Sequence, residues 1–537
     1  MSSFRNTIAR TAAGGAAGLL AGFTALAVAE LVAGVVRPAA GPVTVVGGAV
    51  IDRTPAAVKD FAIRAFGEND KLVLQLGILA LLALFALFLG VLALRYRRVG
   101  AAGVLVFGAV GAAAALSRPD SAGPADALPS LAGAVAGAAV LYLLAGRATR
   151  AGSPAGEEGA DGDGSGGDGG GGGWNRRGFL TAAAVTAAAA TGAGALGRTL
   201  SGRRGRGAIA SRSGLTLPAP ASPAPAVPSG AELKVPGIGA FTTPNRDFYR
   251  VDTALVVPRV DAGAWRLRIH GKGVTRPRTY TFEQLLARPL IERHITLTCV
   301  SNEVGGPYLG NARWLGVPLA GLLAECGVKP PSKGGQADQL VARSVDGMTL
   351  GSPVEDVMDG RDAMLAVGMN GEPLPFDHGF PVRMLVPGLY GYVSACKWIE
   401  DIELTTFDAY DPYWVKRKWA RRAPIKTQSR IDTPKPFARP ATDGGTVMVA
   451  GVAWAQRRGI TRVEVRIDDG PWQDADLAAQ DTVDTWRQWS YRWQATPGGH
   501  TITVRATDGT GQTQTDQRTR TVPDGASGHH SVFVTVA

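Results

Sequence analysis

Four long apolar stretches precede residue 150, and they restrict the fold of the N-terminal part more than any other feature of the sequence. They cover about residues 13–36, 72–94, 99–117 and 130–146. Each is close to the roughly 20 residues that an α-helix needs to cross a bilayer. The sequence therefore predicts a four-helix transmembrane region over residues 1–150. The third and fourth stretches are rich in Ala and Gly, so either could instead be a packed or partly re-entrant segment.

Arginines beside these stretches predict their direction. Clusters precede the first stretch, follow the second and follow the fourth: Arg5 and Arg10; Arg95, Arg97 and Arg98; Arg147 and Arg150. Positive residues favour the cytoplasmic side, so a cytoplasmic N-terminus puts all three clusters inside. The segment 37–71 fits less well, because it would lie outside with five basic residues, diluted by four acidic ones.

The distribution of histidine and methionine argues against a haem in this region. All six histidines lie beyond residue 150, and so does every methionine except Met1. Haem iron in a helix bundle normally takes such side chains as axial ligands. The helices are therefore predicted to be an anchor and not a cytochrome b.

Residues 151–212 combine a linker with a second membrane signal. The run 152–173 is rich in Gly, Asp and Glu and is predicted to be a flexible cytoplasmic linker. It is followed by Asn175-Arg-Arg-Gly-Phe-Leu180 and an Ala-rich stretch to about Gly197, which resembles a twin-arginine export signal placed inside the chain. Alternatively, Arg176 and Arg177 are the inside-flanking charges of a fifth transmembrane helix. Both interpretations put the C-terminal part outside the cytoplasm.

The net charge of +11 and the isoelectric point near 9.7 raise the question of nucleic-acid binding. No basic helix or aromatic-plus-basic nucleic-acid motif is identified in the sequence, and many arginines flank apolar segments instead. The sequence therefore predicts no nucleic-acid partner.

The exported part is predicted to contain two domains. Residues 213–236 are rich in Pro and Ala and are expected to form a semi-rigid spacer that holds a globular domain off the membrane. Residues 237–410 mix strands such as 265–269 with short helices at 281–287 and 319–326, as in an α+β domain. The remainder, 411–537, contains a connecting segment and, from about Gly444, alternating apolar residues that predict an all-β sandwich of about 90 residues.

One cysteine of the α+β domain stands out. Ile295, Leu297 and Cys299 alternate with threonines as in a strand, and Gly and Pro follow. A thiol at a strand end, facing a loop, can ligate a soft metal or act as a nucleophile; the alternative is an inert buried cysteine. Cys326 lies on a predicted apolar helix face and is expected in the core, and Cys396 receives no role. Three cysteines cannot all pair within the chain, so a disulfide scaffold is not expected.

Four sequence blocks in a specific order carry a family resemblance. They are Thr243-Pro-Asn-Arg-Asp-Phe-Tyr-Arg250, the Cys299 stretch ending in Gly310-Asn-Ala-Arg-Trp-Leu-Gly-Val317, Met369-Asn-Gly-Glu-Pro-Leu-Pro-Phe-Asp-His-Gly-Phe-Pro-Val-Arg383, and 387–398. Together they resemble the sulfite oxidase family of molybdenum-cofactor enzymes over about residues 237–537. The C-terminal part looks like the immunoglobulin-like dimerisation domain of that family, which implies a possible homodimer.

The resemblance implies a molybdenum–molybdopterin cofactor and assigns residues to it. Cys299 would supply the protein thiolate to molybdenum, beside the two sulfurs of one pterin dithiolene. The pterin and its phosphate would be held by five residues, namely Asn245, His378, Arg383, Ser394 and Lys397, and phosphate suits Arg forks and Lys point charges. For His378 and Arg383 the alternative is a structural turn. Arg313 would either orient the cofactor or brace the Cys299 loop.

Several departures from the family pattern concern the substrate. Sulfite oxidases follow the ligand cysteine with Asn and a basic pair, whereas Asn302 is followed here by Glu303 and Val304. A carboxylate there would repel a dianion. Arg250 lies one position from an expected anion-binding arginine, Asp252 stands near an expected His, and no Tyr occurs in 346–353. The pocket rim is predicted to comprise Arg250, Glu303 and Tyr308. The scaffold and the cofactor are expected to carry over, and sulfite is not.

The sequence thus predicts a multi-pass cell-membrane protein with an extracytoplasmic molybdopterin oxidoreductase domain. It would act on a small-molecule substrate by oxygen-atom transfer, in a direction left open, and exchange electrons with a separate carrier that is a cytochrome or quinone-linked. Two alternatives remain: a reductase of oxidised sulfur groups such as methionine sulfoxide, and a cofactor-free surface binding protein.

Overall fold

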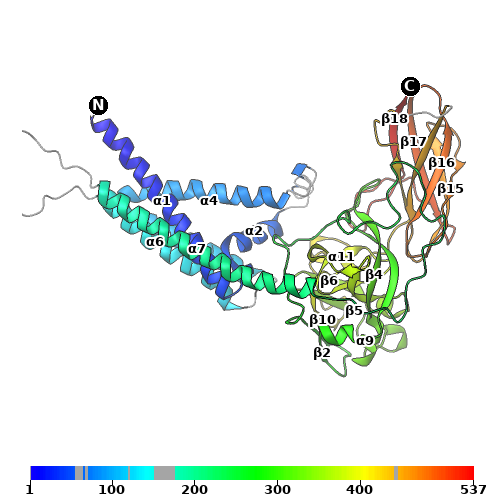
Figure 1. Cartoon of the computed structure of the whole chain (residues 1–537), viewed down its shortest axis with the longest axis horizontal. Coiled ribbons are helices and arrows are strands. Elements are labelled where there is room, and N and C mark those ends of the chain that lie inside the picture. Colours follow the sequence, from blue (N-terminus) through cyan, green and yellow to red (C-terminus); the bar gives the residue numbers. More distant parts are fainter. Residues whose placement is uncertain are drawn as a thin grey trace, which may run out of the picture. The chain divides into compact units, whose positions relative to one another are not determined.

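The computed structural model describes residues 2–54, 58, 65–66, 70–118, 121, 123–149, 176–440 and 445–537. It divides into two compact units, Met1–Arg206 with Thr253–Val256 and Gly207–Asp252 with Val257–Ala537. Each is described by itself below (Figure 1). The predicted linker, residues 152–173, and Asn175 of the export signal lie outside the described residues.

The first unit is helical. Its elements are α1 (Ser2–Val35), η1 (Pro38–Ala40), α2 (Pro42–Arg53), α4 (Asp70–Arg95), α5 (Arg97–Ser117), η3 (Pro124–Ala127), α6 (Leu128–Thr149) and most of α7 (Arg176–Ser213). Five helices are long and apolar enough to cross a membrane, over Thr7–Val35, Lys71–Arg95, Arg97–Ser117, Pro124–Thr149 and Arg177–Ser213. The four predicted stretches are therefore helical, and the two Ala/Gly-rich ones form continuous helices. The fifth helix extends well beyond Gly197, where the sequence predicted its end.

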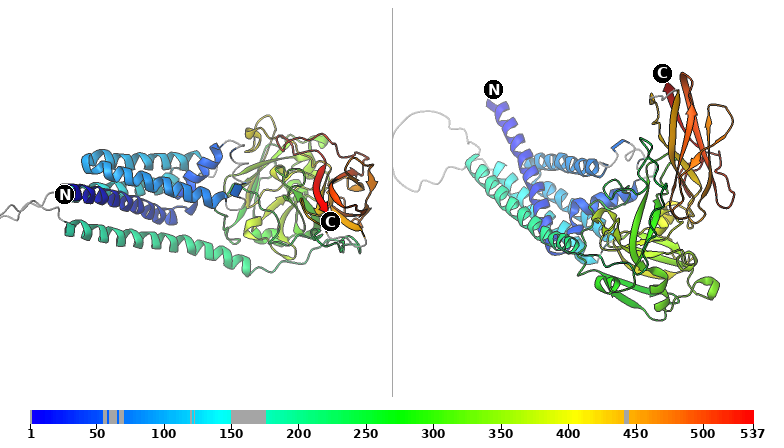
Figure 2. Two further views of the ribbon diagram at one scale, coloured as in Figure 1. Left: turned by 90° about the horizontal axis from the view of Figure 1, so that it is seen from above. Right: turned by 45° about the vertical axis from the view of Figure 1, so that its right-hand side comes forward.

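Small residues let these helices approach closely (Figures 1 and 2). A Cβ on Gly18 of α1 would come within 2.9 Å of Gly90 on α4, and one on Gly133 of α6 within 2.9 Å of Ala29 on α1. A Cβ on Gly197 of α7 would likewise come within 2.8 Å of the backbone of Glu30 on α1. In lipid no hydrophobic driving force brings helices together. Helices there usually associate through close packing at small residues such as these. The Ala and Gly content of the stretches thus serves helix packing.

The second unit begins with two mixed or antiparallel sheets that share one core. The first sheet has the order β2-β1-β10-β5-β6 and the second β3-β4-β7-β8, with β9 paired to β7. All pairings are antiparallel except β1 with β10. The strands are β1 (Arg266–Gly271), β2 (Arg278–Thr281), β3 (Ile291–Thr298), β4 (Leu309–Pro318), β5 (Gln339–Ser344), β6 (Thr349–Pro353), β7 (Met364–Met369), β8 (Glu372–Pro373), β9 (Arg383–Leu385) and β10 (Ile399–Thr405).

Short helices connect these strands: α8 (Phe282–Leu286), α9 (Leu319–Glu325), η4 (Pro331–Lys333), α10 (Val354–Met358), η5 (Phe376–His378), α11 (Gly391–Ser394) and η6 (Val415–Arg417). Thr281 and Gln284 form a capping box at the start of α8, which satisfies two backbone donors that the first turn leaves open. Cys326 is fully buried in the common core, as its helical pattern predicted. The α+β prediction for this part is confirmed.

The C-terminal part is all-β and consists of two four-stranded antiparallel sheets, β11-β12-β16-β15 and β14-β13-β17-β18. Their strands are β11 (Gln428–Thr433), β12 (Thr446–Trp454), β13 (Ile460–Ile467), β14 (Gln473–Asp474), β15 (Asp476–Leu477), β16 (Arg487–Gln494), β17 (Gly498–Asp508) and β18 (His530–Val536). The inward residues of both sheets form one core that includes Val449, Val463, Trp489 and Val504. The alternating pattern predicted β13, β16 and β17, whereas β11 precedes the predicted start of the all-β region.

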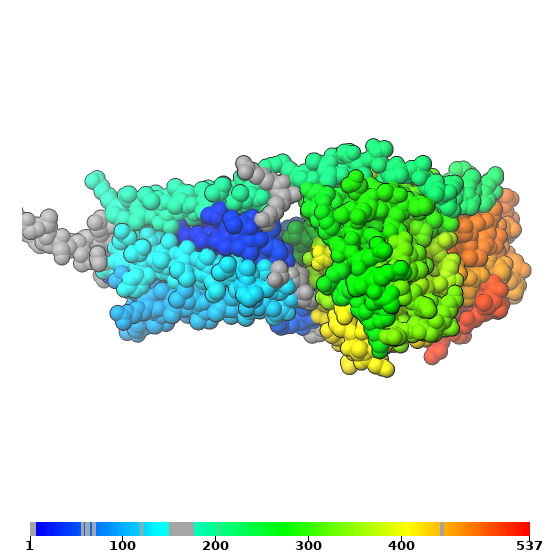
Figure 3. Space-filling view, turned by 90° about the horizontal axis from the view of Figure 1, so that it is seen from below, coloured from blue at the N-terminus to red at the C-terminus, as the bar shows by residue number. Residues whose placement is uncertain are grey.

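The Pro/Ala-rich segment is extended, as predicted, but it lies on the surface of the second unit (Figure 3). Ser222 forms a parallel bridge with Ile291 of β3, and Leu233 donates its backbone N–H to Gln488 at 2.6 Å. These contacts tie the segment to the domain, and its role as a semi-rigid spacer that holds the domain off the membrane stays a prediction. The segment pairs there because β3 is the edge strand of its sheet, and an unpaired edge is best covered.

Candidate active site

Cys299 is the first residue after β3, at the head of the loop that leads into β4. Its backbone N–H donates to the carbonyl of Tyr308 at 3.0 Å, and its carbonyl accepts from the N–H of Asn302 at 3.1 Å. The side-chain oxygen of Asn302 accepts from the Tyr308 N–H at 2.7 Å. The loop is therefore closed by three hydrogen bonds, which fix the backbone that carries the Cys299 thiol. The structure confirms a thiol at a strand end.

The C-terminal domain supports the same loop. Gly305 has a φ of +80° and packs so closely on the ring of His530 in β18 that a Cβ would come within 2.2 Å of it. Arg430 of β11 donates to the carbonyl of Gly306 at 3.0 Å. The Gln456 amide donates to the carbonyl of Thr296 at 3.0 Å, inside β3. The all-β domain thus helps to position the strand and the loop that carry Cys299.

A buried ion pair lies beside the thiol. Lys397 Nζ is 2.9 Å from Asp252 Oδ2, and the two side chains are only 8% and 6% exposed. Arg250 Nε lies 3.3 Å from the same carboxylate oxygen, and its Nη1 lies 3.1 Å from Asp377. Arg250 is therefore held between two carboxylates.

The pKa of the Cys299 thiol is set by opposing effects. Burial raises it above its ordinary value, while hydrogen bonds from Ser301 and the positive charge of Lys397 lower it. Burial has the largest effect, so the thiol is protonated at neutral pH unless a further positive charge binds to it. A metal ion would supply that charge and keep the thiolate deprotonated.

His378 and Arg383 form a second buried group next to the ion pair. His378 Nε2 lies 3.1 Å from the carbonyl oxygen of Asn245, while its Nδ1 is buried without a partner. Arg383 lies over the ring of Trp314 at 5.4 Å, and its Nε is also buried without a partner. Buried polar atoms in folded proteins are normally hydrogen-bonded, and both atoms remain available to a ligand.

The charge states of these two residues follow from their surroundings. Burial, together with the charges of Arg383 and Lys397, lowers the pKa of His378 to about 3, so its ring is neutral at physiological pH. Burial lowers the pKa of Arg383 to about 10, and the guanidinium remains charged. The group therefore presents one neutral acceptor or donor and one cation to whatever binds there.

The other predicted cofactor residues are satisfied by the protein itself. The Asn245 amide donates to the Met369 carbonyl at 3.2 Å and accepts from Asn370 at 2.9 Å. The Ser394 hydroxyl is fully buried and donates to backbone carbonyls at 3.0 and 3.1 Å within the α11 region. Arg313 is exposed on β4 and lies 3.3 Å from Glu292. The side chain of Arg313 is thus tied to Glu292, and its contact with a cofactor stays a prediction.

The predicted rim residues differ in position. Tyr308 is half-buried and meets the ring of Tyr249 edge-on at 6.4 Å. Glu303 is exposed in the Cys299 loop. Arg250 is exposed in part and is bound to Asp252 and Asp377. All three border the loop or the ion pair, and their part in a reaction stays a prediction.

Sequence reasoning missed Tyr249. Its ring stacks on Phe248 at 5.2 Å, and its phenol is electrostatically coupled to both Cys299 and Arg383. Burial, and then the nearby thiol, raise its pKa. The signal was present in the block that contains Arg250, since Tyr249 is the residue before it, but the sequence analysis placed only Tyr308 at the pocket rim.

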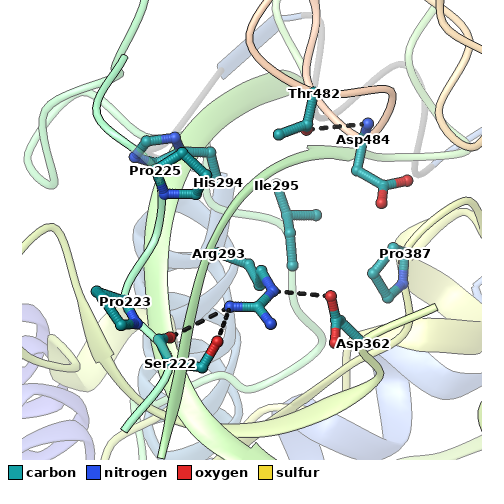
Figure 4. Close-up of a pocket in the computed structure, with 10 residues that line it drawn as sticks. All are labelled: Ser222, Pro223, Pro225, Arg293, His294, Ile295, Asp362, Pro387, Thr482 and Asp484. Carbon is teal, nitrogen blue, oxygen red and sulfur yellow. Dashed lines mark hydrogen bonds and ion pairs between the residues drawn. The ribbon is translucent and has the colours of Figure 1, made fainter. Parts of the chain in front are cut away.

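A separate cavity of about 340 Å³ lies elsewhere in the second unit. Its lining includes Ser222, Arg293, His294, Asp362 and Asp484. Arg293 spans it, binding Asp362 at 2.7 Å and Ser222 at 3.1 Å, as Figure 4 shows. None of the predicted site residues lines this cavity, so the site at Cys299 is defined by its contacts instead.

Comparison with known proteins identifies the family of this domain. Residues 254–414 match the family "Oxidoreductase molybdopterin binding domain". Mitochondrial sulfite oxidase of Mus musculus is 29% identical over 292 residues, which cover 47% of this chain and 52% of that protein. Residues 254–414 are therefore a molybdopterin-binding oxidoreductase domain, similar to that of the sulfite oxidases.

Two further likenesses extend the comparison. Inducible nitrate reductase [NADH] 2 of Glycine max is 30% identical over 321 residues, which cover 49% of this chain and 36% of that protein. The crystal structure of the sulfane dehydrogenase SoxCD from Paracoccus pantotrophus is 26% identical, covers 55% of this chain and 82% of that chain, and has a TM-score of 0.47. The chain spans about half the length of the sulfite oxidase of Mus musculus that it matches.

The cofactor of the sulfite oxidase family domain is molybdenum–molybdopterin. The residues present fit it on three counts. His378 Nδ1 and Arg383 Nε are buried and lack partners. Arg383 and Lys397 supply positive charge suited to a phosphate. The Cys299 thiol is 8% exposed and lies in the field of Lys397.

Proposed function

We propose that this chain is a membrane-anchored, extracytoplasmic molybdenum oxidoreductase that transfers oxygen atoms and exchanges electrons with a separate carrier. One observation carries the proposal. A buried thiol, Cys299, stands in the field of the Lys397 charge, and the adjoining His378 and Arg383 each leave one buried nitrogen unpaired. This is the arrangement expected of a site that awaits a metal with an anionic organic ligand.

Each residue of the candidate site has a proposed role. Cys299 would hold molybdenum through its thiolate, and Lys397 would stabilise that thiolate. Arg383 and Lys397 would hold the pterin phosphate, with Asn245, Ser394, His378 and Arg313 as its further contacts. When bound, the cofactor supplies the exchange of an oxygen atom and two electrons. The protein supplies binding, orientation and local charge.

The substrate pocket favours a substrate that is not a dianion. Arg250, the cation nearest to the expected anion site, is already compensated by Asp252 and Asp377. Glu303 adds an exposed carboxylate to the Cys299 loop, and like charges close to a binding site cost affinity. These observations support a neutral oxygen donor or acceptor over sulfite. A second candidate is therefore the reduction of oxidised sulfur groups, such as methionine sulfoxide.

The proposed membrane anchoring and extracytoplasmic location are supported by the sequence and by the long helices. Five helices are long and apolar enough to span a membrane, and the arginine clusters favour a cytoplasmic N-terminus. Arg176 and Arg177 would act as a twin-arginine-like signal at the start of α7. The C-terminal sheets would form an immunoglobulin-like domain through which two chains could pair. The catalytic domain would then lie on the extracytoplasmic side.

Elemental analysis of the wild type and of two cysteine variants tests the proposal. Full-length protein from a host that makes the cofactor should contain about one molybdenum per chain, and Cys299→Ser should lose turnover and most of the metal. Cys326→Ala is the matched control, because Cys326 is equally buried in the core but lies outside the Cys299 group. Wild-type protein without molybdenum would favour the cofactor-free binding protein instead.

The substrate is tested on the same preparation. Methionine sulfoxide with a chemically reduced dye as donor should be turned over faster than sulfite with an electron acceptor. The reverse order of rates would show that Arg250 serves anion binding despite its carboxylate partners. Both rates should disappear in Cys299→Ser.

A further inference from the structure

An aromatic and cationic segment lies at the surface of the second unit. Residues 414–422 read Trp-Val-Lys-Arg-Lys-Trp-Ala-Arg-Arg, with five basic residues and no acidic one. Lys416, Lys418, Arg421 and Arg422 are exposed. Of these, Arg421 is paired with Asp411 at 2.9 Å and with Asp408 at 3.8 Å, so the charge of the surface comes mainly from the other basic residues. We call residues 414–422 the cationic segment.

The cationic segment is held rigidly. Its cations lie over aromatic rings, with Lys416 5.1 Å from the Tyr410 ring, Arg417 3.5 Å from the Tyr413 ring and Arg422 5.6 Å from the Phe407 ring. Trp414 and Trp419 meet edge-to-face at 6.1 Å. The backbone N–H of Ala420 donates to the carbonyl of Pro523 at 2.9 Å. The positive charges are therefore presented by a fixed surface.

One short helix connects this surface to Cys299. The Tyr392 hydroxyl donates to the carbonyl of Ala420 at 2.7 Å, and its ring lies 5.6 Å from Trp419. Tyr392 belongs to α11, whose first residue is Gly391. A Cβ on Gly391 would lie 3.7 Å from the carbonyl oxygen of Thr298 and 3.9 Å from the Tyr249 hydroxyl. Since Thr298 directly precedes Cys299, α11 contacts both the cationic segment and the strand end that carries the candidate metal ligand.

We propose that the cationic segment is the docking surface for a small redox protein whose redox centre is surrounded by acidic residues. This inference rests on the proposed function, because it names the partner that would exchange electrons with the site at Cys299. Electron exchange between proteins requires the two redox centres to come close together, and the cationic segment is a charged surface close to Cys299. Opposite charges at the rim of such an interface raise the association rate.

An anionic phospholipid surface would also attract these cations. A surface that enters lipid exposes its tryptophans, as in the aromatic belts of membrane proteins. Trp414 and Trp419 are instead half-buried, and they pack on each other and on Tyr392. The rings thus stiffen the surface, which favours a protein partner.

Electron exchange with carriers of different charge tests the docking surface. The full chain in uncharged detergent is reduced with one equivalent of dithionite and mixed with an acidic c-type cytochrome, a basic c-type cytochrome or benzoquinone, a small uncharged oxidant. Each cytochrome takes up one electron from the reduced enzyme. The variant is Lys416→Glu with Lys418→Glu. The control is Lys329→Glu with Lys333→Glu, two exposed lysines of the same unit outside the cationic segment.

We expect the acidic cytochrome to react faster than the basic one with wild-type protein at low salt. The variant should slow the acidic cytochrome by about tenfold or more, and about 0.5 M salt should remove most of the difference. Benzoquinone rates and molybdenum content should stay unchanged, and so should all rates of the control. An unchanged rate with the acidic cytochrome, or a faster reaction of the wild type with the basic one, would overturn the inference.

Two further measurements separate the alternatives. If binding to anionic vesicles depends on Lys416 and Lys418 while carrier rates do not, the surface serves lipid and the inference is overturned. If the protein contains no molybdenum and does not react with benzoquinone, the proposed function fails. Surface plasmon resonance with the acidic cytochrome then still tests docking, because loss of binding in the variant supports it and equal binding overturns it.

Discussion

Lys397 and Asp252 form a buried ion pair with 2.9 Å between Nζ and Oδ2. A buried ammonium group without a partner would tend to lose its proton, because burial disfavours the charged form. Asp252 therefore keeps Lys397 charged beside Cys299, whose pKa the charge lowers. Arg250 shares the carboxylate at 3.3 Å, so Asp252 keeps a partner when Lys397 is replaced.

The first prediction concerns the charge of Lys397. In cofactor-free protein, Lys397→Met should raise the pKa of the Cys299 thiol, because a positive charge that favours the thiolate is removed. Alkylation of Cys299 by iodoacetamide, followed by mass spectrometry over a range of pH, should be roughly tenfold slower at pH 8. Lys426→Met is the control, since Lys426 pairs with Asp524. An alkylation profile identical to that of the wild type would show that Lys397 does not act on the thiol.

The second prediction concerns Arg383. Lys keeps the charge but lacks the planar fork that binds phosphate through two hydrogen bonds. Arg383→Lys should therefore retain the pterin and molybdenum about tenfold less well through gel filtration, which corresponds to the loss of one charge-assisted hydrogen bond. Fluorescence of the released, oxidised pterin measures the content. Arg288→Lys, at a partly exposed pair with Glu325, should leave the content unchanged; equal losses in both variants would contradict the role.

The sequence predicted those parts of the fold that local patterns determine. The length of the apolar stretches predicted the long helices, and period-two alternation predicted β13, β16 and β17. The break in the pattern after Cys299 placed the thiol at a strand end. Local patterns do not determine which surface a segment covers. The Pro/Ala-rich stretch was predicted as a semi-rigid spacer, and nothing in its composition predicts that Ser222 pairs with Ile291 at the open edge of β3.

The candidate site was predictable as a set of residues and not as a set of contacts. His378, Arg383 and Lys397 come from the family blocks, and the structure brings them near Cys299. Their pairing depends on residues far apart in the chain. Asp252 is 145 positions from Lys397, and no local pattern joins them. The contacts of His530 and Arg430 with the Cys299 loop could likewise not be predicted from the sequence, because these two residues belong to a different domain.

The third prediction concerns acid stability. His530 accepts a hydrogen bond from the Ile431 N–H at 3.0 Å through Nδ1. Burial lowers its pKa to about 4, aided by Arg430 and Arg518 and opposed by Asp432. The unfolded chain binds this proton near pH 6.5 and the folded chain only near pH 4, so stability falls as the pH drops through that window.

A variant pair checks the sign. His530→Asn offers an amide oxygen to the Ile431 N–H and does not titrate. Between pH 7 and pH 4.5 its melting temperature should therefore fall less than that of the wild type, and the difference between the two falls should be roughly 3–6 °C. His500→Asn should behave oppositely. Its hydrogen bond to Asp468 raises the pKa of His500, and the stability it adds is present at low pH and lost as the pH rises. Parallel melting curves for His530→Asn and the wild type would contradict this account.

The last prediction concerns Tyr249. Burial raises its pKa, as does the nearby Cys299 thiol, while Arg383 lowers it. The phenol therefore keeps its proton, and its O–H can donate a hydrogen bond to the oxygen atom of a substrate beside Cys299. Removing one positioned hydrogen-bond donor typically lowers a rate by a factor of about 10² to 10³. Tyr249→Phe should thus reduce turnover of a small sulfoxide by about tenfold or more.

The fold should tolerate this change, because the ring keeps its stacking on Phe248 at 5.2 Å and only the hydroxyl is lost. Molybdenum content and melting temperature should therefore match the wild type. Tyr280→Phe is the control, since its hydroxyl lies 3.4 Å from Glu325 in the same domain, outside the Cys299 group. If Tyr249→Phe kept its rate, the hydrogen bond would have to come from another group, of which Tyr308, edge-on to the same ring, would be the next to test.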